Sequence, residues 1–126
     1  MSWLSSVLLV TFGHMNTISS PYQIVMTTFP DMDSAQQLAE QLVTRKLAAC
    51  VNILPVMTSI YRWQGKLEQG QEHQLLIKTE QSCTNEVQSA IEQVHPYELP
   101  EIIVVPILTG HRPYLNWISE SVHKND

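Results

Sequence analysis

Basic residues are scarce in this chain of 126 residues, which holds 7 Lys+Arg against 12 Asp+Glu and has a net charge of −5. The basic residues are scattered along the sequence and form no run. Because phosphate binding needs a clustered positive face, this pattern argues against a nucleic-acid surface. We therefore expect no nucleic-acid partner.

Cysteine and glycine are also scarce. The two cysteines, Cys50 and Cys83, form neither a CxxC motif nor a disulfide framework, and they favour a reducing cytoplasm. The four glycines include no glycine-rich phosphate loop after a predicted strand. The sequence thus argues against Rossmann and P-loop enzymes.

Long hydrophobic runs are missing as well. The apolar stretch 1–12 is too short to cross a membrane, and no Lys or Arg precedes it as a secretory signal requires. We interpret residues 1–20 as an extension outside the core, which an upstream start ahead of Met15 would explain, and the polar stretch 16–21 as a linker. A secretory signal is the alternative. Residues 21–126 are then a single domain, and we expect no membrane partner.

The rest of the chain alternates β-rich and helical patterns. Residues 22–29 predict a strand, and Asp33, with Gln36 as its capping-box partner, predicts the start of a helix whose apolar stripe reaches Leu47. A hairpin follows, with a strand over 51–63 broken at Pro55, a turn at Gln64 and Gly65, and a strand over 66–79. A second helix is capped by Ser82 or Thr84 and ended by Pro96. The last predicted elements are a strand over 100–109 and a helix starting at Pro113. The strand over 100–109 is the most hydrophobic, so we expect it to be central.

This β-α-β-β-α-β order with a closing helix predicts an α+β fold, in which an antiparallel sheet carries both helices on one face. The hairpin around Gly65 has arms of about 14 residues, or roughly 45 Å. A domain of this size is only about 26–30 Å across. A projecting ribbon would expose open edges and the apolar side chains near its tip. We therefore expect a homo-oligomer in which neighbouring subunits cover the hairpin.

Residues able to bind a metal ion are spread along the chain. No pair has a ligand spacing such as HxxxH or CxxC, so a site must be assembled by folding or between subunits. A thiolate combined with an imidazole would suit copper or zinc. The candidates are Cys50, Cys83, His73, His95, His111, Asp31, Glu72, Glu98 and Glu101. Because Cys83 lies beside two possible capping residues, we expect it to be exposed.

Two short segments allow more than one interpretation. In KLAACVN, residues 46–52, Cys50 follows two alanines, where a small buried residue is the simplest reading, although metal ligation stays open. A nucleophilic role would need a base such as Lys46 or His95 beside it. HPYELPE, residues 95–101, reads either as a rigid loop or as a loop that binds a ligand or metal.

The aromatic residues Tyr61, Trp63 and Trp117 are interpreted as packing or interface residues. We expect no enzyme.

Six stretches occur together in one order. They are Thr28-Phe29-Pro30, KLAACVN at 46–52, SIYRWQGKLE at 59–68, LLIKTE at 75–80, HPYELPEI at 95–102 and YLNWI at 114–118. Through these motifs the chain resembles the CutA-type divalent-cation-tolerance family, from residue 22 to residue 122.

The resemblance implies a ferredoxin-like domain that assembles into an interlocked trimer through its long hairpins. It also implies a cytoplasmic protein linked to tolerance of copper and other divalent ions, with a trimer that resembles the PII signalling proteins. In copper-binding relatives a cysteine precedes T-x-P and two histidines precede Pro-Tyr. The corresponding positions here hold Thr27, Val94 and His95, so His95 remains from that set, and Cys50 matches the cysteine of L-A-A-C. The implied metal residues are therefore His95 and Cys50, with copper as the ion.

Overall fold

The main sheet of the computed structural model, which describes residues 8–12 and 15–122, is antiparallel. Its strands are β3 (Tyr22–Phe29), β4 (Cys50–Ile53), β5 (Met57–Trp63), β6 (Lys66–Glu80) and β7 (Ile103–Pro106). The strand order is β4-β6-β3-β7, and β5 pairs with the first part of β6. A separate two-stranded sheet pairs β1 (Leu8–Phe12) with β2 (Met15–Ser19).

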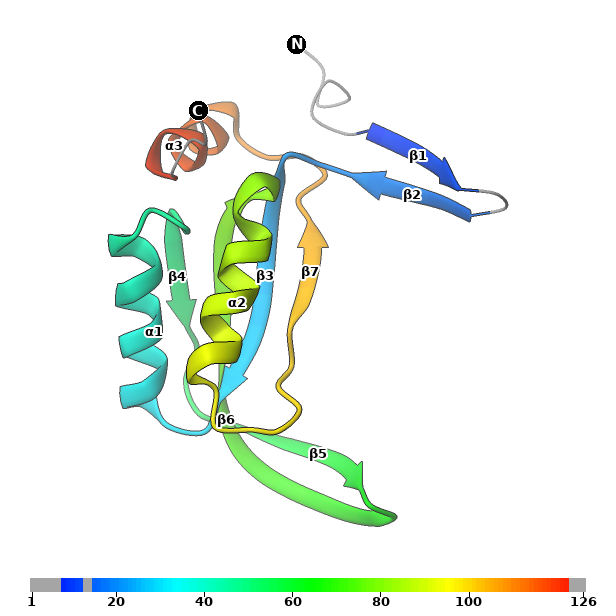
Figure 1. The fold of residues 1–126 in the computed structure, drawn as a ribbon, viewed down its shortest axis with the longest axis vertical. Coiled ribbons are helices and arrows are strands. Elements are labelled where there is room, and N and C mark those ends of the chain that lie inside the picture. The colour runs from blue at the N-terminus through cyan, green and yellow to red at the C-terminus, as the bar shows by residue number, and fades with distance from the viewer. Residues whose placement is uncertain (1–7, 13–14, 123–126) are drawn as a thin grey trace.

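Helices α1 (Met32–Thr44) and α2 (Thr84–Val94) cover the same face of this sheet (Figure 1). Helix α3 (Arg112–Ser121) lies at the end of the sheet opposite the β5–β6 hairpin (Figure 1). This arrangement confirms the predicted ferredoxin-like α+β fold with its closing helix. Across residues 8–12 and 15–122, no helix is both long and apolar enough to cross a membrane.

The hydrophobic core lies between the sheet and the two covering helices. Val25, Thr27 and Phe29 alternate along β3, and all three are fully buried. The residues that pack on them lie at helical spacing: Ala35, Leu38 and Leu42 on α1, and Val87, Ala90 and Ile91 on α2. Val43 and Val94 have the spacing expected of the same apolar stripes, but both are exposed. The apolar periodicity of both helices therefore arises from packing against the central strands.

The start of α1 differs from the prediction. Asp31, rather than Asp33, is the N-cap, and its carboxylate accepts hydrogen bonds from the backbone N–H of Ser34 at 2.8 Å and from the Ser34 hydroxyl at 3.0 Å. Asp33 lies in the first turn, where an acidic residue favours the positive end of the helix dipole. Both residues suit a helix N-terminus, so the sequence pattern alone does not distinguish the cap from the first turn.

The cap makes helix stability depend on pH. The two hydrogen bonds from Ser34 hold the pKa of Asp31 below its ordinary value of 3.8. Because the folded-state pKa is depressed, the stabilisation is present above the unfolded-state pKa and is lost as pH falls through the folded value. We expect Asp31→Ala to lower Tm by a few degrees at neutral pH, whereas Asp31→Asn, which keeps the acceptor, loses much less.

Thermal melts from pH 7 to pH 3 test this expectation. The difference in Tm between the wild type and Asp31→Ala should shrink as pH falls below 3.8. The difference between Asp31→Asn and Asp31→Ala should stay constant, because the amide does not titrate. A pH-independent difference for the wild type would contradict the capping role of the carboxylate.

The long hairpin forms as predicted. Pro55 lies in the break between β4 and β5, and Gln64 and Gly65 make the turn with φ of 50° and 79°. Positive φ at both central residues is the requirement of the hairpin turn whose twist matches the strands. Gly70 pairs with Ser59 in an uninterrupted register, so β6 passes through this glycine without a bulge. β6 is 15 residues long, and the hairpin extends beyond the helices (Figure 1).

Four other local predictions are wrong. The strand predicted at the sheet centre is shorter, and β7 lies at an edge, where Ile103, Val104 and Val105 are exposed. Cys83, expected to be exposed, is buried because the short helix over Gln81–Cys83 turns it into the core.

Neither Ser82 nor Thr84 caps α2, since Cys83 is the N-cap and makes no side-chain cap hydrogen bond. The predicted linker over 16–21 contains β2, whose backbone pairs with β1 in spite of its polar composition. The interpretation of residues 1–20 as an extension outside the core stays a prediction.

Candidate functional site

His95 lies at the C-terminal cap of α2 and fastens the following loop to β3. Its Nε2 is 2.6 Å from the carbonyl oxygen of Thr28, so Nε2 carries the proton and donates it. Its Nδ1 accepts a hydrogen bond of 3.1 Å from the backbone N–H of Tyr97. The imidazole also packs on the ring of Phe29, with centroids 4.4 Å apart. Both ring nitrogens are thus engaged with the backbone, and a metal ion at either one would have to displace such a bond.

Cys50 is the first residue of β4 and is half-buried. It pairs with Lys78, which in turn pairs with Ile24 on β3, whereas His95 bonds to Thr28 on that strand. Four residues of strand correspond to about 13 Å, and two strand spacings add about 9–10 Å sideways. One protomer therefore does not bring Cys50 and His95 together.

The other candidate ligands are dispersed or otherwise engaged. Asp31 caps α1, and the Nδ1 of His73 is 2.9 Å from the carbonyl oxygen of Leu54. Glu101 accepts a hydrogen bond of 3.0 Å from Gln74. Within residues 8–12 and 15–122, no group of three or more His, Cys, Asp or Glu side chains could hold a metal ion. A metal site thus does not fit the residues of a single protomer.

Thr27 and Val94 stand where the family resemblance implies a cysteine and a histidine in copper-binding relatives, and their surroundings differ. Thr27 is fully buried, and its hydroxyl has no hydrogen-bond partner among the described residues. Val94, at the end of α2, is exposed and carries no ligand atom. Neither side chain replaces the cysteine or histidine of those relatives as a metal ligand.

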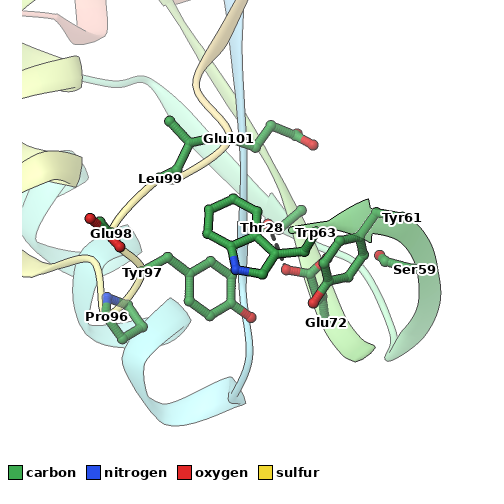
Figure 2. Close-up of a pocket in the computed structure, with 10 residues that line it drawn as sticks. All are labelled: Thr28, Ser59, Tyr61, Trp63, Glu72, Pro96, Tyr97, Glu98, Leu99 and Glu101. Carbon is green, nitrogen blue, oxygen red and sulfur yellow. Dashed lines mark hydrogen bonds between the residues drawn. The ribbon is translucent and has the colours of Figure 1, made fainter. Parts of the chain in front are cut away.

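A cavity of about 580 Å³ opens between the β5–β6 hairpin and the loop after α2 (Figure 2). Its aromatic walls are Tyr61, Trp63 and Tyr97, which Figure 2 shows gathered around the carboxylate of Glu72. Ser59, Tyr61 and Trp63 alternate along β5, so all three side chains point to the same side of the hairpin. The cavity has the size of a small-molecule site.

The Glu72 carboxylate is held in place from two sides. The Thr28 hydroxyl donates a 3.0 Å hydrogen bond to its Oε2. Burial, followed by the charge and the hydrogen bond of Glu72, raises the pKa of Tyr97 above its ordinary value of 10.0, with a smaller contribution from Tyr61. Tyr97 therefore stays a neutral phenol at physiological pH, and both neighbours of Glu72 are uncharged donors.

The carboxylate of Glu101 is fixed in a second network at the same loop. The side-chain N–H groups of Gln74 reach both Glu101 and the carbonyl oxygen of Thr27, at 3.0 and 2.8 Å. These bonds link β6 to β3 and to the segment before β7. The loop over residues 95–101 is thus tied down at His95 and at Glu101, which makes it a rigid wall of the cavity.

Sequence reasoning recovered only part of this site. It singled out the loop over 95–101 as rigid or as binding a ligand or metal, and Glu72 as a candidate metal ligand. It assigned Tyr61 and Trp63 to packing or to an interface. The available signal was the alternation of Ser59, Tyr61 and Trp63 along a strand, which predicts one common face. Nothing local indicated that Glu72 and Tyr97 would meet this face.

Comparison with known proteins identifies the family. The family model for the CutA1 divalent ion tolerance protein matches residues 23–121. This chain belongs to the CutA1 family. The Divalent-cation tolerance protein CutA of Yersinia pestis (strain Pestoides F) is 46% identical over 99 residues, which cover 79% of this chain and 83% of the relative.

Solved structures of CutA1 proteins share the fold. CutA from Xylella fastidiosa superposes with a TM-score of 0.80 at 43% identity, covering 82% of this chain and 100% of that one. The Periplasmic divalent cation tolerance protein CutA from Archaeoglobus fulgidus gives a TM-score of 0.78 at 34% identity, covering 81% and 99%. The likeness therefore extends over nearly the whole length of these structures.

Proposed function

We propose that this chain functions in tolerance to divalent cations, copper among them, as a cytoplasmic homotrimer without catalytic activity. The observation that carries the proposal is the family match over residues 23–121. The Yersinia relative, which is 46% identical over 99 residues, is called a divalent-cation tolerance protein. The two scarce thiols, of which Cys50 is half-buried and Cys83 buried, are consistent with a reducing compartment.

Exposed apolar side chains support assembly into an oligomer. On one face of the β5–β6 hairpin, Ile60 and Leu67 are 67% and 79% exposed. The edge strand β7 adds Ile103, Val104 and Val105, whose backbone groups on the outer side face no further strand of the sheet. Open edges and large exposed apolar areas are typical of surfaces that pair with another chain. In the proposed trimer, copies of the chain cover both surfaces.

Cys50 and His95 are the proposed copper ligands, and each would bind copper at a separate contact between subunits. Because one protomer keeps them apart, each requires further ligands from a neighbouring subunit. The half-buried thiol of Cys50 is the more available of the two, since His95 would have to release the N–H of Tyr97 or the carbonyl oxygen of Thr28.

The test uses bacterial cells that lack their own CutA1-family gene. Expression of this chain should raise the copper concentration that halves growth, and Cys50→Ser or His95→Gln should remove the gain. Purified Cys50→Ser and His95→Gln should each bind copper at least about tenfold more weakly in a competition titration. Gln is chosen at position 95 because its amide can keep a donor directed at Thr28.

His111→Gln is the matched control, since His111 is exposed and lies outside both contacts. It should leave copper affinity and growth unchanged. Tolerance that is restored equally by all variants would remove Cys50 and His95 from the mechanism. Failure of the wild type to restore any tolerance would contradict the proposed function itself.

A second candidate function is a PII-like role, in which the trimer binds a small molecule and signals its presence. The supporting observation is the preformed cavity of about 580 Å³ with rigid aromatic and carboxylate walls. This role needs no metal ligand, so it stands or falls independently of the copper proposal.

A further inference from the structure

Three aromatic rings and a fixed carboxylate share the walls of the cavity beside the β5–β6 hairpin. Tyr61 and Trp63 approach from β5, and Tyr97 approaches from the loop after α2 (Figure 2). The faces of aromatic rings attract cations, most strongly when the site is partly desolvated. The walls thus offer an apolar surface whose ring faces attract positive charge.

The charge of the lining has one sign. The residues that line the cavity include Glu72, Glu98 and Glu101 and, within the described part of the chain, no Lys, Arg or His. Of their carboxylates, that of Glu72 lies among the aromatic rings (Figure 2). The hydrogen bonds that Glu72 accepts come from uncharged hydroxyl groups, so they leave its negative charge uncompensated. Alternation along β5 places the side chain of Arg62 on the opposite face of the hairpin from Tyr61 and Trp63. Lys66 pairs with Trp63 and shares its face, but it is not among the residues that line the cavity.

The shape of the site favours an organic cation over a metal ion. A divalent metal ion needs several ligand atoms that converge within bonding distance, and no such group of side chains occurs in residues 8–12 and 15–122. A volume of about 580 Å³ is far larger than a bare ion requires and lies in the usual range for small organic ligands. Aromatic walls beside one carboxylate are the combination that recognises an alkylammonium group.

We propose that this cavity binds a small organic cation with an alkylammonium group, which packs against Tyr61, Trp63 and Tyr97 and pairs with Glu72. The proposal deepens the PII-like candidate function by naming the ligand class, and it does not depend on the copper role. It needs the residues of one protomer only, and it requires that the neighbouring subunits of the assembly leave the cavity open.

The probe for this site is choline, and its control ligand is 3,3-dimethyl-1-butanol, which has the same shape without the charge. A nuclear magnetic resonance titration of the full chain in metal-free buffer follows the indole N–H signal of Trp63. We expect saturable shifts with choline, and binding of the neutral alcohol that is weaker by at least about tenfold. Glu72→Gln, which keeps the shape and an acceptor for Thr28, should weaken choline binding by a similar factor.

Trp63→Leu tests the aromatic wall, with choline binding then followed by the signals of Thr28 and Glu98. It should weaken binding about tenfold, whereas Trp117→Leu, which removes an exposed aromatic outside the cavity, should not. Equal affinity for choline and the alcohol, or no effect of Glu72→Gln, would overturn the proposal. So would the absence of saturable binding in the wild type, as expected if a second copy fills the cavity. The alcohol and Glu72→Gln comparisons remain decisive if Trp63→Leu does not fold.

Discussion

Phe29→Ala is expected to lower the free energy of unfolding by about 3–5 kcal/mol, because it removes a fully buried ring from the end of the central strand β3. The ring also supports the imidazole of His95, with centroids 4.4 Å apart. Its loss leaves a cavity beneath the loop that carries Tyr97. The substitution should therefore destabilise the domain and loosen one wall of the candidate site together.

Chemical denaturation with a two-state fit measures the first effect. Phe29→Leu keeps most of the apolar volume and should cost clearly less than the alanine variant. Hydrogen exchange at the Tyr97 amide, which donates to His95, measures the second effect, and it should accelerate in Phe29→Ala more than in Phe29→Leu. A loss below about 1 kcal/mol would contradict the assignment of Phe29 to the core.

Ile60→Glu combined with Leu67→Glu is expected to dissociate the proposed trimer. The strand register pairs Arg62 with Leu67, so Ile60 and Leu67 share the face of the hairpin opposite Tyr61 and Trp63. Covering this face with another subunit would bury the new charges without partners, at a cost of several kcal/mol for each. The folded domain needs neither side chain, since both are largely exposed in one protomer.

Sedimentation velocity at micromolar concentration measures this effect. The double variant should sediment mostly as a species of 14.4 kDa, while the wild type sediments at about three times that mass. Gln36→Glu with Gln37→Glu is the control, because it adds the same charge to exposed positions of α1. An unchanged trimer in the hairpin variant would show that the interface lies elsewhere. Circular dichroism should show that both variants keep their folded spectrum.

Local patterns were sufficient to predict most of the fold. The apolar stripe from Ala35 to Leu42 identified α1, because helical periodicity is a direct consequence of burying one face. Gly65 marked the hairpin turn since its φ of 79° is a conformation that glycine adopts without strain. Pro96 ended α2 by restricting the backbone of the residue before it.

Features that depend on distant residues could not be predicted in the same way. The hydrophobic strand over 100–109 suggested a central position, but composition alone does not tell whether a strand lies at the centre or at the edge of a sheet. For the same reason, Tyr61 and Trp63 could be recognised as sharing a face, whereas their meeting with Glu72 and Tyr97 depends on how the loop after α2 folds back. Likewise, the sequence pattern did not indicate that both ring nitrogens of His95 form hydrogen bonds with the backbone.

Both proposed roles depend most on the covering of the exposed hairpin and of β7 by further copies of the same chain. Light scattering coupled to gel filtration of the unmodified protein, in metal-free buffer at micromolar concentration, tests this point directly. The predicted mass is about three times the 14.4 kDa of one chain. A stable mass of 14.4 kDa would contradict it, since Ile60, Leu67 and the edge of β7 would then face water.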